Sequence, residues 1–136
     1  MKTLLINCSL IIIVLVSCLP TEDSYTPEQS KIIGTPINIG NLEVAQNDFP
    51  EYMTWSQAVK SCKALGSGWR LPTKSELNLL YKNKDKIGGF GDYQYYWSST
   101  KFSNDYAWVQ SFNHGGQYDA NKNYSYGSGV RAVRSF

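Results

Sequence analysis

The chain has 136 residues, a formal net charge of +2 and a single histidine. That length favours one folded domain, and a near-neutral charge without a basic stripe argues against a nucleic-acid partner. The three cysteines match neither a metal-binding spacing nor a disulfide framework.

Residues 1–17 have the layout of an export signal. Lys2 precedes the apolar run LLINCSLIIIVLV, which is too short and wrongly flanked for a comfortable membrane span. The segment ends in LVSC, which resembles the lipobox of bacterial lipoproteins, where cleavage before a cysteine leaves that cysteine lipidated. The resemblance implies a lipidated Cys18 and an anchor in the bacterial cell envelope, at the outer membrane or cell surface. An uncleaved anchor and an ordinary signal peptide remain the alternatives.

The next stretch, 18–31, is polar and contains Pro20 and Pro27, which predicts a flexible tether. A folded domain is expected over 32–136. It opens with INIGNLEV at 37–44, where two short apolar runs flank Gly-Asn, as in a two-residue β-hairpin.

Two capping boxes predict two helices. The motif TWSQ at 54–57 begins the first helix, and Gly66 ends it. The motif TKSE at 73–76 begins the second, which ends around Asn83 and is followed by the basic turn KNKDK. Cys62 falls on the apolar face of the first helix, so it is expected to be a small core residue rather than a catalytic thiol.

Residues 95–136 alternate two kinds of sequence. The pieces YYWSST, AWVQSF and VRAVRSF mix β-branched and aromatic residues with polar ones and predict short strands. The intervening FSNDY, NHGGQYDAN and NYSYGSG are rich in turn formers and tyrosine, a composition that antibody binding loops share. The pattern predicts a strand scaffold with a binding surface at the end of the chain.

These elements follow an order that resembles a known family. WxxAxxxC at 55–62, GWRLPT at 68–73, YWSST at 96–100 and VRAVR at 130–134 are similar to the C-type-lectin-like domain of bacterial surface lipoproteins in the formylglycine-generating-enzyme, or sulfatase-modifying, superfamily. The resemblance covers roughly residues 37–136. It implies an α+β, C-type-lectin-like fold in which two helices pack on a small, twisted, mostly antiparallel sheet with the chain ends close together.

Within that family the chain is most similar to variable proteins of diversity-generating retroelements, in which a reverse transcriptase rewrites adenines at the 3′ end of the gene. Asn codons of the form AAY are the usual targets, and they can never become Lys, Glu, Gln, Met or Trp. None of those five residue types occurs in 102–106, 113–116, 118–121 or 123–129. Because loops avoid Trp and Met in any case, a diversified region and a fixed loop surface both stay open.

The predicted binding residues are aromatic and polar side chains of these segments. Aromatic rings supply contact area, while Asn, Asp and Ser supply adaptable hydrogen bonds to a protein or glycan ligand. A fixed-surface adhesive or structural envelope lipoprotein that binds matrix polysaccharide is the alternative. The set is Phe102, Ser103, Asn104, Asp105, Tyr106, Asn113, His114, Tyr118, Asp119, Asn121, Tyr124 and Tyr126.

Catalysis has little support in the sequence. The formylglycine-generating enzymes use paired cysteines that bind copper, whereas the domain after Cys18 contains only Cys62. His114 lies in NHGG without a clear Ser or Cys partner. A non-enzyme is therefore expected, and a degenerate enzyme of that superfamily is the third hypothesis.

No cofactor is expected either. The triplets with which calcium-dependent lectins bind sugar are absent. Asn104, Asp105, Asp119 and Asn121 could supply some of the oxygens that calcium needs, so a calcium site stays an alternative.

Two tryptophans and three arginines are assigned to the scaffold. Trp69 and Trp97 lie inside GWRLPT and YWSST and are expected in the core. Arg70 is expected to pair with Glu76, and the two arginines of VRAVR with other acids of the domain.

Overall fold

The computed structural model describes residues 25–136 except 94, 125 and 127. The predicted export signal and Cys18 lie outside the described residues. Within this range, no helix is both long enough and apolar enough to cross a bilayer. In chain order the elements are α1 (Pro27–Ile33), β1 (Ile37–Ile39), β2 (Leu42–Val44), α2 (Trp55–Ala64), α3 (Lys74–Lys82), α4 (Lys84–Ile87), β3 (Tyr95–Lys101), β4 (Tyr106–Ser111), β5 (Gln117–Asn121), β6 (Ser128–Gly129) and β7 (Val133–Ser135).

Helix α1 shows that the tether prediction is wrong for the last residues of 18–31. The Thr26 hydroxyl accepts a hydrogen bond from the Gln29 amide at 3.2 Å, and the Gln29 side chain accepts one from the Thr26 amide at 2.6 Å. Pro27 occupies the first turn, where proline needs no hydrogen-bond donor and has a suitable φ. The proline that suggested a tether thus begins a helix.

The end of α1 ties the start of the described chain to its C-terminal part. Ile32 and Ile33 are both buried and belong to the main apolar core. The Tyr25 hydroxyl accepts a hydrogen bond from Arg134 Nη1 at 3.3 Å. The folded domain therefore begins by Tyr25, and the two ends of the domain lie close together.

Helices α2 and α3 begin at the two predicted capping boxes. Thr54 and Thr73 each accept a hydrogen bond from the amide three residues on, and the side chains of Gln57 and Glu76 reciprocate. Helix α2 ends just before Gly66, whose φ is +130°. Part of the predicted basic turn KNKDK forms the short helix α4.

The described strands form two sheets rather than one. The predicted hairpin pairs β1 with β2, and β7 adds to the other edge of β2. The larger sheet has the order β5-β4-β3-β6, in which only the β3–β6 pair is parallel. YYWSST and AWVQSF form β3 and β4 as predicted, whereas only three residues of VRAVRSF pair as β7.

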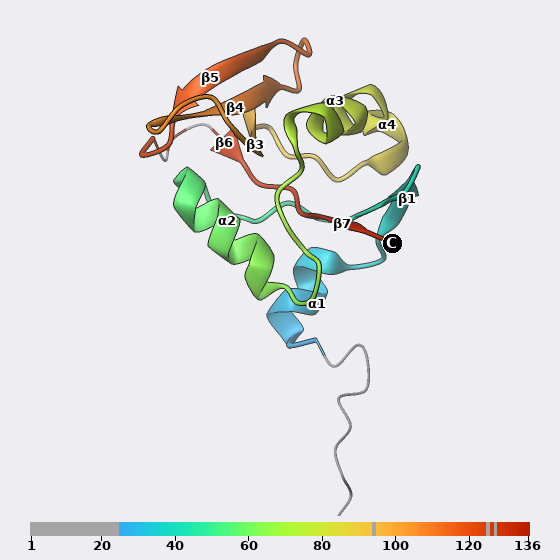
Figure 1. The fold of residues 1–136 in the computed structure, drawn as a ribbon. Helices are drawn as coiled ribbons and strands as arrows, with labels where there is room; N and C mark the ends of the chain where they lie inside the picture. The colour runs from blue at the N-terminus through green and yellow to red at the C-terminus, as the bar shows by residue number, and fades with distance from the viewer. Residues whose placement is uncertain (1–24, 94, 125, 127) are drawn as a thin grey trace, which may run out of the picture.

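The larger sheet separates α2 from α3, as Figure 1 shows. Trp97 and Val109 pack in one apolar cluster with Cys62 of α2. Tyr96, next to Trp97 and therefore on the opposite face of β3, packs in a second cluster with Leu80 of α3. This layered α+β arrangement confirms the predicted fold class. It leaves the edge strand β5 available for other contacts.

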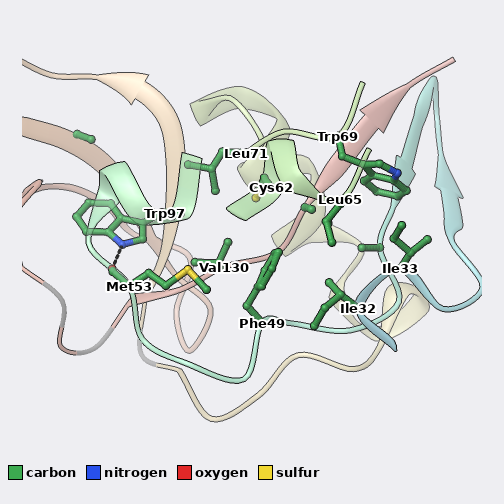
Figure 2. Packing of buried hydrophobic residues seen from close by; sticks show 14 of the residues in the cluster. Ile32, Ile33, Phe49, Met53, Cys62, Leu65, Trp69, Leu71, Trp97 and Val130 are labelled. Carbon is green, nitrogen blue, oxygen red and sulfur yellow. Dashed lines mark hydrogen bonds between the residues drawn. The ribbon is translucent and has the colours of Figure 1, made fainter. Parts of the chain in front are cut away.

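The first cluster contains both tryptophans that the sequence assigned to the core. Trp69 and Trp97 lie at opposite ends of it, with Cys62 and Phe49 between them (Figure 2). The indole N–H of Trp97 donates to the Met53 carbonyl at 2.9 Å (Figure 2). Both indoles are buried, so their scaffold assignment is confirmed.

Candidate ligand-binding surface

The β3–β4 loop presents the first group of predicted residues, and 102–106 are all exposed. The Phe102 ring meets the Trp108 ring edge-on at a centroid distance of 5.3 Å. The Lys74 ammonium lies 3.3 Å from the centroid of the Trp108 ring. Trp108 therefore forms a half-buried aromatic base under this loop, with a cation against it.

The path of this loop is set by hydrogen bonds to main-chain oxygens. The amides of Phe102 and Ser103 donate to the Tyr106 carbonyl at 2.9 and 3.0 Å. From the turn after β5, the Lys122 ammonium donates to the carbonyls of Ser103 and Asn104 at 2.7 and 2.6 Å. The bonds from Lys122 connect the loop to the turn that follows the edge strand β5.

The β4–β5 turn presents Asn113 and His114, both exposed. Nδ1 of His114 accepts a hydrogen bond from the Gly116 amide at 3.2 Å, and its ring centroid lies 6.1 Å from that of Tyr118. Gly115 has a φ of +84° and packs against the Tyr81 ring, so any side chain at this position would be strained and would clash.

Strand β5 corrects the predicted loop NHGGQYDAN. Tyr118, Asp119 and Asn121 lie on a strand, because pairing with β4 outweighs the weak strand preference of Asp and Asn. Tyr118 lies opposite Val109, and Asp119 lies opposite Trp108. Neighbouring side chains of a strand point to opposite faces of the sheet, and both Tyr118 and Asp119 line the groove at this edge of the sheet.

Tyr118 shares a groove of about 490 Å³ with Tyr124 and Tyr126. Val109, Asp119 and Ala120 also line the groove, together with Ser128 and with Tyr95 from β3. The Tyr95 and Tyr118 rings meet edge-on at a centroid distance of 6.0 Å, and those of Tyr124 and Tyr126 at 6.4 Å. The groove therefore combines apolar floor atoms with several tyrosines, a composition suited to ligand contact.

The predicted residues thus form two areas rather than one. Tyr118, Tyr124 and Tyr126 line the groove on the sheet face that packs on α2. The loop 102–105 lies at the far end of β5, where Tyr106 pairs with Asn121. Asn113 and His114 lie at the opposite end of β5, on the Tyr118 side.

Two residues of the surface were missed by the sequence analysis, which assigned Tyr95 and Trp108 to the framework. The signal for Tyr95 is the alternation within YYWSST, which places it on the opposite face from the buried Tyr96. For Trp108, the signal is the neighbouring buried residues Ala107 and Val109 in AWVQSF. In each of these two pieces, consecutive side chains of one strand point to opposite faces of the sheet.

The arginines are held within the domain, as predicted. Arg70 pairs with Glu76 at 2.7 Å, and Arg134 with Glu43 at 2.6 Å. The hydrogen bond from Arg70 lowers the pKa of Glu76, and it does so more strongly than partial burial raises it.

Arg131 forms the most deeply buried ion pair that the structure describes. Its Nε donates to Asp48 Oδ1 at 2.6 Å, and neither side chain exposes more than 8% of its surface. The Tyr96 hydroxyl donates to the other Asp48 oxygen at 2.6 Å. Burial, and then the charge of Asp48, raise the pKa of Tyr96 far above its usual range.

The described residues contain no group of three or more His, Cys, Asp or Glu side chains able to hold a metal ion. Cys62 is fully buried, as predicted, and burial raises the pKa of its thiol to about 12. At neutral pH a thiol with that pKa is protonated and unreactive. Cys62 is therefore a core residue rather than a nucleophile.

A sequence model of the Lcl C-terminal domain matches residues 35–134. The chain belongs to the Lcl C-terminal domain family. The match includes the capped helices α2 and α3, the strands β1 to β6 and the first two residues of β7. It also includes all twelve residues predicted to bind ligand. No curated protein matches the chain.

Solved structures of low sequence identity share the fold. A chain from the complex of a mutant von Willebrand Factor A1 domain with botrocetin matches with a TM-score of 0.52 and 11% identity, over 74% of this chain and 96% of that one. EMS16, an antagonist of the collagen receptor integrin alpha2beta1, matches with a TM-score of 0.50 and 13% identity, over 74% and 95%. The Lcl C-terminal domain described here therefore has a C-type-lectin-like fold.

Proposed function

We propose that this domain is a non-catalytic binding module that recognises a protein or glycan through its C-terminal surface. The observation that carries the proposal is the groove lined by Tyr95, Tyr118, Tyr124 and Tyr126, in which the last three side chains are exposed. Within the described part of the chain, no hydrogen bond involves the hydroxyls of Tyr118, Tyr124 or Tyr126, so these groups are available to a ligand. Such rings supply large contact areas at a small entropic cost.

The structural neighbours support the protein alternative for the ligand. One comes from a complex of the A1 domain of von Willebrand Factor with botrocetin, and the other is described as an antagonist of an integrin. Since a shared fold does not carry a shared function, the support lies in the type of recognition and not in the partner.

The proposal predicts that changing Tyr118, Tyr124 and Tyr126 together to Ser abolishes binding. Aromatic anchors at the centre of an interface can each contribute about 2 kcal/mol or more to binding. The measurement is retention of the purified domain on an array of polysaccharides and of immobilised surface proteins. Tyr52→Ser is the matched control, because Tyr52 is also an exposed tyrosine but lies before α2. Equal retention of the triple variant and the parent protein would contradict the proposal.

We also propose that the domain is displayed on the bacterial cell envelope by lipid on Cys18. The support is the LVSC sequence after the apolar run. In the producing cells, Cys18→Ser is expected to abolish incorporation of an alkyne fatty acid and to leave the precursor unprocessed. Equal label in the variant and the parent protein would exclude lipidation at this position.

Diversification by a retroelement is the finer form of the proposal, and a fixed surface that binds matrix polysaccharide is its alternative. The support for diversification is the absence of Lys, Glu, Gln, Met and Trp from the four loop segments. The DNA downstream of the gene distinguishes the two. A near-copy of the 3′ end that differs only at adenines, beside a reverse-transcriptase gene, is expected for a diversified surface. Membership of the formylglycine-generating-enzyme superfamily rests on the sequence resemblance alone.

A further inference from the structure

We propose that Lys122 is the positioning residue of the β3–β4 loop, and that it sets the path of this loop independently of the loop's own side chains. The inference goes beyond ligand binding, because it concerns how the exposed segment Phe102–Tyr106 keeps its shape. It would stand even if this surface bound nothing.

Lys122 holds three consecutive carbonyls of the loop. Its ammonium donates to Ser103 and Asn104 at 2.7 and 2.6 Å, and its amide donates to Asp105 at 2.8 Å. Hydrogen bonds from an ammonium are stronger than those between neutral groups. Because every acceptor is a main-chain oxygen, any residue at these three positions offers the same acceptor.

Lys122 is itself fixed on the side away from the loop. Its carbonyl accepts a hydrogen bond from the Trp55 amide at 2.9 Å, at the start of α2. Its ammonium also lies 4.9 Å from the centroid of the Trp55 ring. The residue therefore connects the loop to α2, which packs against the apolar core.

The polar side chains of the loop make few hydrogen bonds that would hold its shape. The Ser103 hydroxyl accepts a hydrogen bond from the Tyr106 amide at 3.2 Å, which is the longest bond in the loop. Within the described residues, the side chains of Asn104 and Asp105 make no hydrogen bond or ion pair. Five hydrogen bonds to main-chain oxygens, three from Lys122 and two to the Tyr106 carbonyl, thus stand against one from a loop side chain.

The β4–β5 turn is held in the same way by residues outside it. The Lys84 ammonium donates to the Phe112 carbonyl at 3.0 Å. The side-chain amide of the buried Gln110 donates to the Gly115 carbonyl at 3.0 Å. Side chains from outside each segment therefore donate hydrogen bonds to its main-chain oxygens in both cases.

Amide hydrogen exchange measured by NMR tests the proposal without any ligand. In Lys122→Met, which keeps the aliphatic stem but removes the ammonium, exchange at the amides of Phe102 and Ser103 is expected to rise about tenfold or more. Buried amides of β4 are expected to keep their protection, which separates loss of loop shape from global unfolding. In the double variant Asn104→Ala and Asp105→Ala, the Phe102 and Ser103 amides are expected to stay within about threefold of the parent protein.

Lys101→Met is the matched control, because this neighbouring lysine also lies near the Trp55 ring, at 5.9 Å, but donates no hydrogen bond to the loop carbonyls in the described structure. It is expected to leave the loop amides protected. The proposal is overturned if Lys122→Met leaves the exchange of Phe102 and Ser103 unchanged. It is equally overturned if the double alanine variant, or Lys101→Met, raises that exchange as much as Lys122→Met does.

Discussion

Trp69, Trp97 and Tyr96 expose at most 2% of their surface, whereas Tyr118 and Tyr126 expose 47% and 77%. Two of these buried rings also have fixed polar ends, since the Trp97 indole donates to the Met53 carbonyl and the Tyr96 hydroxyl donates to Asp48. Tyr118 and Tyr126 instead contact other tyrosine rings edge-on, with ring-centroid distances of 6.0 and 6.4 Å. Aromatic residues thus build both the scaffold and the candidate surface, and burial distinguishes the two groups.

The largest effect is expected in the buried region. Trp97→Ala should lower the free energy of unfolding by about 3–5 kcal/mol, because it removes a large ring from a packed core. It also leaves the Met53 carbonyl without its indole donor. Denaturant unfolding followed by circular dichroism measures the loss. A change below about 1 kcal/mol would mean that Trp97 does not belong to a tightly packed core.

The next effect concerns the buried ion pair. Arg131→Met should lower the free energy of unfolding by about 3 kcal/mol, because it leaves the Asp48 carboxylate buried without its cation. Arg134→Met is the matched control, since the Arg134–Glu43 pair is partly exposed and should contribute about 1 kcal/mol or less. Urea unfolding of both variants compares them. Equal losses would show that burial of the pair does not decide its contribution.

A smaller, pH-dependent effect is expected at the Arg70–Glu76 pair. Arg70 lowers the pKa of Glu76 in the folded protein below its ordinary value of 4.5. The stability that this carboxylate contributes is therefore fully present above the ordinary pKa, and it is lost as the pH falls through the lowered pKa.

Glu76→Gln should accordingly be less stable than the parent protein near neutral pH, and the difference should shrink as the pH falls through the acid range. Thermal melts over a pH series measure it. Glu28→Gln is the control, because Glu28 is exposed and forms no ion pair within the described residues. A difference that stays constant down to the acid limit would rule out the pair as its source.

The smallest effect per residue is expected on the candidate surface. Changing Tyr118, Tyr124 and Tyr126 together to Ser should cost at most about 0.5 kcal/mol of stability each, as exposed substitutions usually do. Thermal melts alongside Trp97→Ala measure the contrast directly. If the triple variant loses as much stability as Trp97→Ala, these rings belong to the core, and the comparison between the two regions fails.

Local signals in the sequence predicted a large part of this fold. Thr54 and Thr73 cap helices because their side chains satisfy free amides within the same turn, a contact that needs no tertiary partner. The Gly-Asn pair of the first hairpin acts over a similarly short distance. The same local chemistry could have revealed α1, since Thr26 and Gln29 form a third capping box, but the two prolines of 18–31 suggested a tether instead.

The position of the candidate surface depended on tertiary structure. The sequence 117–121 carries loop-forming residues and becomes β5 only because β4 offers it a complete set of main-chain partners. That pairing places Tyr118 opposite Val109 and Asp119 opposite Trp108 on the strand that borders the groove, and Tyr95 joins the groove from β3. The role of Lys122 is equally invisible in the sequence, since its three acceptors are carbonyls about eighteen residues away along the chain. Residue types alone therefore predicted which part of this chain carries the candidate surface, and the pairing of distant main-chain groups decided which side chains share it.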